Sequence, residues 1–147
     1  MSDTATLNES VVQSIRSACE RLSLDYCYHA DRKEMVAWSE LFAEDGEIVL
    51  FGASHVGRAA ILASVQGAAD TQSVHAVSNF RIDVISATEA VGLVYIVAYV
   101  TPKKNGVGTM TRIAPMVVGQ YEDRYRKTAE GWRFARRAFV PLIVAES

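Results

Sequence analysis

The sequence predicts an α+β domain in which a curved antiparallel sheet wraps against N-terminal helices. Between residues 11 and 42, apolar residues recur every three or four positions, as they do in amphipathic helices. From residue 74 onward, alternate residues are apolar over several long stretches, which is the period of strands. Helices followed by a run of strands are typical of α+β domains. We therefore expect a cone-shaped sheet with helices across its open side, and this arrangement encloses a cavity.

Length and composition fit a single domain over residues 1–147. Half of the 147 residues are hydrophobic and 22% are charged, so the chain can bury a sizeable core. The formal net charge is −2, from 15 Lys+Arg and 17 Asp+Glu without a block of like sign. Because so balanced a surface offers little to a phosphate backbone, we expect no nucleic-acid partner.

The N-terminus "MSDTATLNES" is polar, and no apolar run approaches the length of a membrane span. We expect a cytoplasmic protein with no membrane partner. Cys19 and Cys27 lie too far apart along one predicted helix for a disulfide, so they are expected to be buried free thiols. No CxxC or HExxH motif occurs and the three histidines are dispersed, so we expect neither a metal nor a cofactor.

The first predicted helix begins after a cap at Asn8 or Ser10 and runs to about Ala30. Asp31 falls off its apolar face, so it is either solvated or turned inward where the helix ends. A second helix should carry four apolar residues on one side and end in a turn at "EDG", residues 44–46; these residues are Met35, Trp38, Leu41 and Phe42.

A strand "EIVLFG" is predicted next, then a turn at "GASHVG" and a third helix from Gly57. The long strand from Val74 to Ile85 should turn His75, Val77 and Asn79 to one face, with His75 toward the cavity. Three further strands are expected at residues 90–101, 116–128 and 131–144, the last two joined by the hairpin turn "AEG".

Three segments bring notable polar groups toward the predicted cavity: "YCYHAD", "VHAVSN" and "WRFARR". If they converge, Asp31 could orient His75, and His75 could abstract a proton from carbon. An arginine at 136 or 137 could then stabilise a departing anion or an enolate. Each residue also has a structural explanation: a satisfied strand histidine, a helix-end carboxylate or a solvated arginine pair.

The order of these segments resembles the SnoaL-like families of the nuclear transport factor 2-like fold. The resemblance rests on "LDYCYHADRKEMVAWSELFAEDGEIVLFG", "GRAAI", "VHAVSNFRIDV" and "YEDRYRKTAEGWRFARR", and it covers a core of about residues 10–140. Among these families, the polar residues are most similar to the branch with scytalone dehydratase, bile-acid 7α-dehydratase and hexachlorocyclohexane dehydrochlorinase. That branch pairs an Asp after the first helix with a His early in the long strand, which implies a catalytic dyad of Asp31 and His75.

The resemblance also implies roles for two further residues. Tyr26 precedes Asp31 by the five residues seen in the bile-acid enzyme, although it could equally be a core aromatic. Arg137 lies five residues beyond Trp132, as an arginine does in the dehydrochlorinase. The second histidine of scytalone dehydratase has no counterpart in "PMVVGQ", so no specific substrate carries over.

The sequence is compatible with three functions. The first is a cofactor-independent lyase that eliminates water or another small leaving group from a small hydrophobic alicyclic or aromatic substrate, with Tyr26 and Arg137 holding the leaving group. The second is an isomerase or polyketide-type cyclase that moves a proton α to a carbonyl. The third is a non-catalytic small-molecule-binding domain. The resemblance also implies self-association, as a homotrimer or alternatively a dimer.

Overall fold

The computed structural model describes residues 6–67 and 70–146, and its helices precede most of its sheet. The helices are α1 (Glu9–Asp31), α2 (Met35–Ser39) and α3 (Arg58–Ser64). Asn8, one of the two expected caps, accepts a hydrogen bond from the Val11 amide at 2.9 Å, which satisfies a free N–H of the first turn. Across the described ranges, no helix is both long and apolar enough to cross a membrane.

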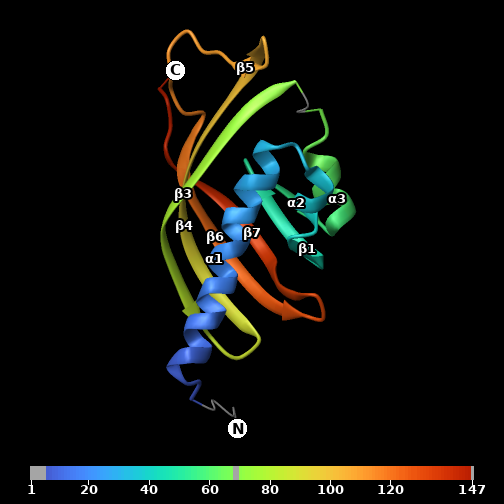
Figure 1. The fold of residues 1–147 in the computed structure, drawn as a ribbon, viewed down its shortest axis with the longest axis vertical. Coiled ribbons are helices and arrows are strands. Elements are labelled where there is room, and N and C mark those ends of the chain that lie inside the picture. The colour runs from blue at the N-terminus through green and yellow to red at the C-terminus, as the bar shows by residue number, and fades with distance from the viewer. Residues whose placement is uncertain (1–5, 68–69, 147) are drawn as a thin grey trace.

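The described residues form one sheet of seven strands, which confirms the predicted α+β class. The strand order is β2-β1-β7-β6-β4-β3, with β5 paired to β4. Neighbouring strands are antiparallel except for β1 and β7, which are parallel. Figure 1 shows α1 lying along one face of the curved sheet, with α2 and α3 near one end. The strands are β1 (Phe42–Leu50), β2 (Ala53–Val56), β3 (Thr71–Val84), β4 (Glu89–Lys104), β5 (Val107–Gly108), β6 (Val117–Thr128) and β7 (Gly131–Ile143).

The second helix is shorter than predicted, because Leu41 lies in a turn after it and Phe42 begins the strand β1. The carbonyl of Leu41 accepts a hydrogen bond from the Phe134 amide at 2.9 Å, and Phe42 pairs in register with Phe134 on β7. Phe42 is completely buried. A short apolar run fits the helical period and a buried strand equally well, so the sequence did not distinguish them.

The predicted turn at residues 44–46 is instead an irregularity within β1. The pairing of β1 with β7 shifts register between Phe42 and Glu47. Gly46 lies in this shift, where an added Cβ would come within 2.9 Å of the Ala43 carbonyl and 3.0 Å of the Phe134 carbonyl. Only glycine permits so close an approach, so this glycine marks a bulge rather than a turn.

The segment 52–57, predicted as a turn, contains the strand β2. The true turn is Phe51 and Gly52, whose φ angles of 50° and 80° are those of a two-residue hairpin connection. β2 then returns antiparallel along β1, with Leu50 opposite Ala53. This hairpin brings Leu50 and Phe51 to the rim of the cavity described below.

The alternation of β3 holds for its first half and reverses at Asn79. His75 and Val77 are partly buried on the inner face, as predicted, while Asn79 is exposed. Asn79 has a φ of 54°, and the pairing with β4 shifts between Ser78 and Arg81. This bulge turns Phe80 inward, so the prediction that Asn79 shares the face of His75 is wrong.

The core fills the space between α1 and the inner face of the sheet. Cys19 and Cys27 are buried there as free thiols, as expected from the stripe on the first helix. Aromatic rings from α1, α2, β1 and β7 pack beside them in tilted or edge-to-face pairs; they include Tyr26, Trp38, Phe42 and Phe134. The helix end that carries Asp31 is thus fixed against the sheet.

Candidate active site

Asp31 and His75 meet across the gap between the end of α1 and the start of β3. The Asp31 Oδ1 atom lies 2.6 Å from His75 Nδ1, and its Oδ2 accepts the His75 backbone N–H at 3.0 Å. The Ser73 hydroxyl donates to Oδ1 at 2.9 Å. Asp31 is therefore turned inward, which was one of the two alternatives left open by the helical pattern. The carboxylate is therefore held by the backbone of β3 as well as by the imidazole ring.

The electrostatics of this pair favour a charged carboxylate. Burial raises the pKa of Asp31, but the hydrogen bonds from His75 and Ser73 outweigh burial and hold that pKa below its ordinary value. An ionised Asp31 accepts the proton on His75 Nδ1, which leaves Nε2 with its lone pair free to accept a proton. Among the described residues, no partner bonds to Nε2. The pair therefore has the geometry of an oriented base.

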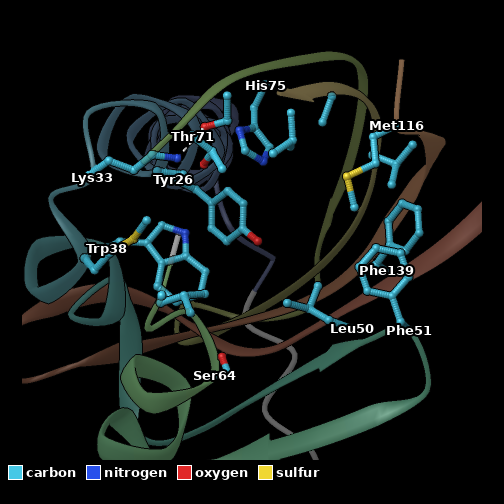
Figure 2. Close-up of a pocket in the computed structure, with 18 of the residues that line it drawn as sticks. Tyr26, Lys33, Trp38, Leu50, Phe51, Ser64, Thr71, His75, Met116 and Phe139 are labelled. Atoms are coloured by element: carbon cyan, nitrogen blue, oxygen red, sulfur yellow. Dashed lines mark hydrogen bonds between the residues drawn. The ribbon is translucent and has the colours of Figure 1, made fainter. Parts of the chain in front are cut away.

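Tyr26 stands beside the histidine at the inner end of the same cavity (Figure 2). Its ring meets the His75 ring edge-on, with centroids 6.4 Å apart. The Tyr121 hydroxyl donates to the Tyr26 hydroxyl across a long 3.5 Å contact, so the Tyr26 proton is left for another acceptor. Burial raises the pKa of Tyr26, and nearby Arg137 offsets only part of this effect, so the phenol remains a neutral donor.

Arg137 does not line the cavity, which corrects the expectation that it contacts a leaving group. Its side chain is completely buried and gives Asp123 two hydrogen bonds, of 2.8 Å from Nε and 2.9 Å from Nη2. Nη2 also donates to Ser23 on α1 at 2.6 Å. Asp123 lies directly opposite Arg137 in the pairing of β6 with β7, and neither residue lines the cavity.

The guanidinium lies behind the tyrosines that face the cavity. Its Cζ is 3.8 Å from the ring centre of Tyr121 and 4.5 Å from that of Tyr26. Cation–π contacts of this kind strengthen when water is excluded. Arg137 therefore contacts two phenol rings that line the cavity and does not itself line it.

The cavity above these groups has a volume of about 450 Å³, within the usual range for small-molecule sites. Apolar side chains form most of its wall, including Leu50, Phe51, Met116 and Phe139 (Figure 2). His75 and Tyr26 present their polar atoms on one side. Among the described residues, no cluster of three His, Cys, Asp or Glu side chains could hold a metal ion.

Three residues of the site were missed by the sequence analysis. Ser73 shares the inner face with His75, two residues away, and this period-2 spacing could have identified it. Tyr121 lies two residues from Asp123 on the same buried face of β6, which is the same kind of signal. Lys33 also lines the cavity, but it follows the end of α1 in a left-handed backbone conformation with a φ of 59°, which no periodicity predicts.

Comparison with solved structures identifies the class of fold. A candidate scytalone dehydratase from Novosphingobium aromaticivorans matches with a TM-score of 0.80 and 26% identity, covering 92% of this chain and 89% of that one. An NTF2-like protein with a cystatin-like fold from the same organism matches at 0.76 and 27%, covering 99% and 94%. A hexachlorocyclohexane dehydrochlorinase shares the fold at 0.72 and 15% identity, covering 95% and 97%.

These matches define an NTF2-like protein with a cystatin-like fold, whose structural neighbours include enzymes. A family model described as a SnoaL-like domain matches residues 13–138, most of the chain. The chain therefore belongs to the SnoaL-like domain family, and the resemblance seen in the sequence is confirmed. None of the curated protein sequences matches it significantly.

Proposed function

We propose that this protein is a cofactor-independent lyase that eliminates water or another small leaving group from a small hydrophobic ring compound. The observation that carries the proposal is the 2.6 Å contact of Asp31 with His75 at the wall of an apolar cavity of about 450 Å³. A carboxylate so close stabilises the imidazolium that forms when the ring accepts a proton. A ring compound that fills this cavity would exclude water from the base and from the leaving group.

In the proposed reaction, His75 Nε2 takes a proton from the carbon adjacent to the one that bears the leaving group. The C–H electron pair becomes the new double bond as the bond to the leaving group breaks. Tyr26 donates a hydrogen bond to the departing oxygen or halide, and Arg137 acts as a positioning residue behind it. For a hydroxyl leaving group, the imidazolium returns its proton to the departing oxygen, so water leaves and His75 is again neutral.

A double-mutant cycle tests the dyad after a screen of small cyclic alcohols, halides and enones for product. Asp31→Asn and His75→Gln should each lower turnover by a factor on the order of 10² to 10⁴, with the fold intact by circular dichroism. The double variant should be scarcely worse than the poorer single one, because residues that act as a unit are not additive. His55→Gln, on β2 outside the cavity wall, is the matched control. Full turnover by His75→Gln would exclude the proposed base.

An isomerase or polyketide-type cyclase is the second candidate, and the neutral Tyr26 hydroxyl favours it. A phenol next to the base can hold the enolate oxygen that forms when a proton moves α to a carbonyl. Release of water or halide separates the two activities, since isomerisation liberates nothing. A non-catalytic binding domain would bind ring compounds without converting any of them, and the substitutions in the dyad would then alter affinity alone.

We also propose that the protein self-associates through the outer face of the sheet, as a homotrimer in preference to a dimer. Alternate residues of β4 carry large apolar side chains that remain exposed there: Val91, Leu93 and Tyr95. A second copy of the chain would cover this apolar stripe. Sedimentation analysis of the protein tests the proposal, and a monomer at micromolar concentration would contradict it.

A further inference from the structure

Lys33 reaches the cavity because the chain reverses sharply after α1. Its φ of 59° places it in the left-handed region, which is usually occupied by glycine or asparagine at the end of a helix. Its backbone N–H donates to the Ala30 carbonyl at 3.2 Å and closes the helix end. A lysine in this conformation has an energetic cost, and the conformation carries its side chain to the cavity wall.

The ammonium group of Lys33 has no direct ion pair among the described residues. Its Nζ donates a hydrogen bond to the hydroxyl of Ser73, at 3.3 Å. The nearby Asp31 carboxylate already accepts hydrogen bonds from the Ser73 hydroxyl and from the backbone N–H and the Nδ1 of His75. Lys33 therefore brings to the cavity a positive charge that no carboxylate contacts.

The charge is also isolated along the cavity wall. The other lining residues are apolar or neutral and polar, apart from the titratable ring of His75, and none of them is Asp or Glu. Figure 2 shows Lys33 above Trp38, with its nitrogen directed toward the side of the cavity where Tyr26 and His75 lie. A ligand held against His75 would thus have a fixed cation at one end.

We propose that Lys33 binds a carboxylate substituent of the substrate, so that the cavity selects small ring compounds with one negative charge. The inference rests on the proposed function only in placing the ligand in the same cavity as the reacting groups. The ammonium and carboxylate would form a charge-assisted hydrogen bond in a partly dry site, where it is stronger than in water. Burial lowers the pKa of Lys33, with Asp31 opposing the effect, and a bound anion would offset that cost of burial.

Calorimetric binding of 2-naphthoate and its neutral counterpart 2-naphthamide tests this inference without any turnover. The wild-type protein should bind the anion about tenfold more tightly than the amide. Lys33→Met and Lys33→Asn should each abolish this preference; asparagine removes the charge but suits the left-handed backbone, so one of the two variants should fold. Lys33→Arg should retain most of the preference.

Two further variants separate this inference from its alternatives. Lys103→Met removes an exposed cation that influences Lys33 electrostatically but does not line the cavity, and it should leave the preference within about twofold. His75→Gln should also keep the preference, which would persist even if no lyase activity is found. Equal affinities for the two probes in the wild type, or an unchanged preference in Lys33→Asn, would overturn the inference.

Discussion

Replacing Asp123 with asparagine should destabilise the protein strongly, because it leaves a buried guanidinium without its counter-ion. The side chains of Asp123 and Arg137 are both fully shielded from solvent, and Arg137 Nη1 already has no hydrogen-bond partner among the described residues. Removing one partner of such a pair typically costs about 3 to 5 kcal/mol. A domain of this size has a total stability of about 5 to 15 kcal/mol.

The corresponding change in melting temperature is large. For a chain of 147 residues, 1 kcal/mol shifts Tm by about 3 °C, so Asp123→Asn should lower Tm by about 10 to 15 °C. Urea unfolding followed by circular dichroism would give the free energy directly. The matched control is Glu47→Gln, which breaks the half-exposed pair of Glu47 with Arg136 and should cost less than about 1 kcal/mol.

A double variant identifies the cause. Adding Arg137→Met to Asp123→Asn removes the unpaired charge, so the pair of substitutions should cost clearly less than the sum of the two single ones. A loss for Asp123→Asn no greater than that for Glu47→Gln would refute the reasoning, since it would mean that the guanidinium is solvated or finds another partner. Strictly additive losses would show that the two side chains do not interact.

Three other predictions concern the dyad, the thiols and the outer face. The pKa of Asp31 lies below its ordinary value of 3.8, so its stabilising effect is present above that value and is lost as the pH falls through the lowered pKa. The difference in unfolding free energy between wild type and Asp31→Asn should therefore shrink as the pH falls through 3.8 toward the lowered pKa. Burial raises the pKa of Cys19 to about 12 and that of Cys27 to about 11, so a thiol reagent should label both only after denaturation; rapid native labelling would contradict the packing of α1. Tyr95→Lys should shift the protein toward monomer in sedimentation, and an unchanged mass would place the interface elsewhere.

The sequence predicted those features that depend on a regular period. The stripe through Cys19 and Cys27 defined the buried face of α1, and strand alternation placed His75 on the inner face of β3. Both patterns follow from the regular repeat of the helix or strand backbone. The direction in which a side chain faces therefore follows from its position in the sequence. The meeting of Asp31 with His75 was predicted only after the family resemblance added a spatial relation between the helix end and the strand.

The features that were missed depend on interruptions of that period. The bulge at Asn79 reverses the faces of β3, and the left-handed turn at Lys33 brings a charge into the cavity. Arg137 was correctly predicted to point inward from its strand, but it was wrongly predicted to reach the cavity. Its side chain is instead buried against Asp123 of the neighbouring strand. Such pairings depend on strand order and on register, and a slip of one residue would give Arg137 another partner.

Because Arg137 is buried behind Tyr26 and Tyr121, the site has a buried part and an exposed rim. These two parts should differ in how many substitutions they tolerate. Substitutions below the tyrosines would change the acidity of the phenols and the stability of the whole domain together, so few of them would be tolerated. The rim residues Phe51 and Met116 are exposed and can change at little cost to folding. New ligand preferences would therefore be acquired by mutation at the entrance, while the groups that we propose for proton transfer stay unchanged.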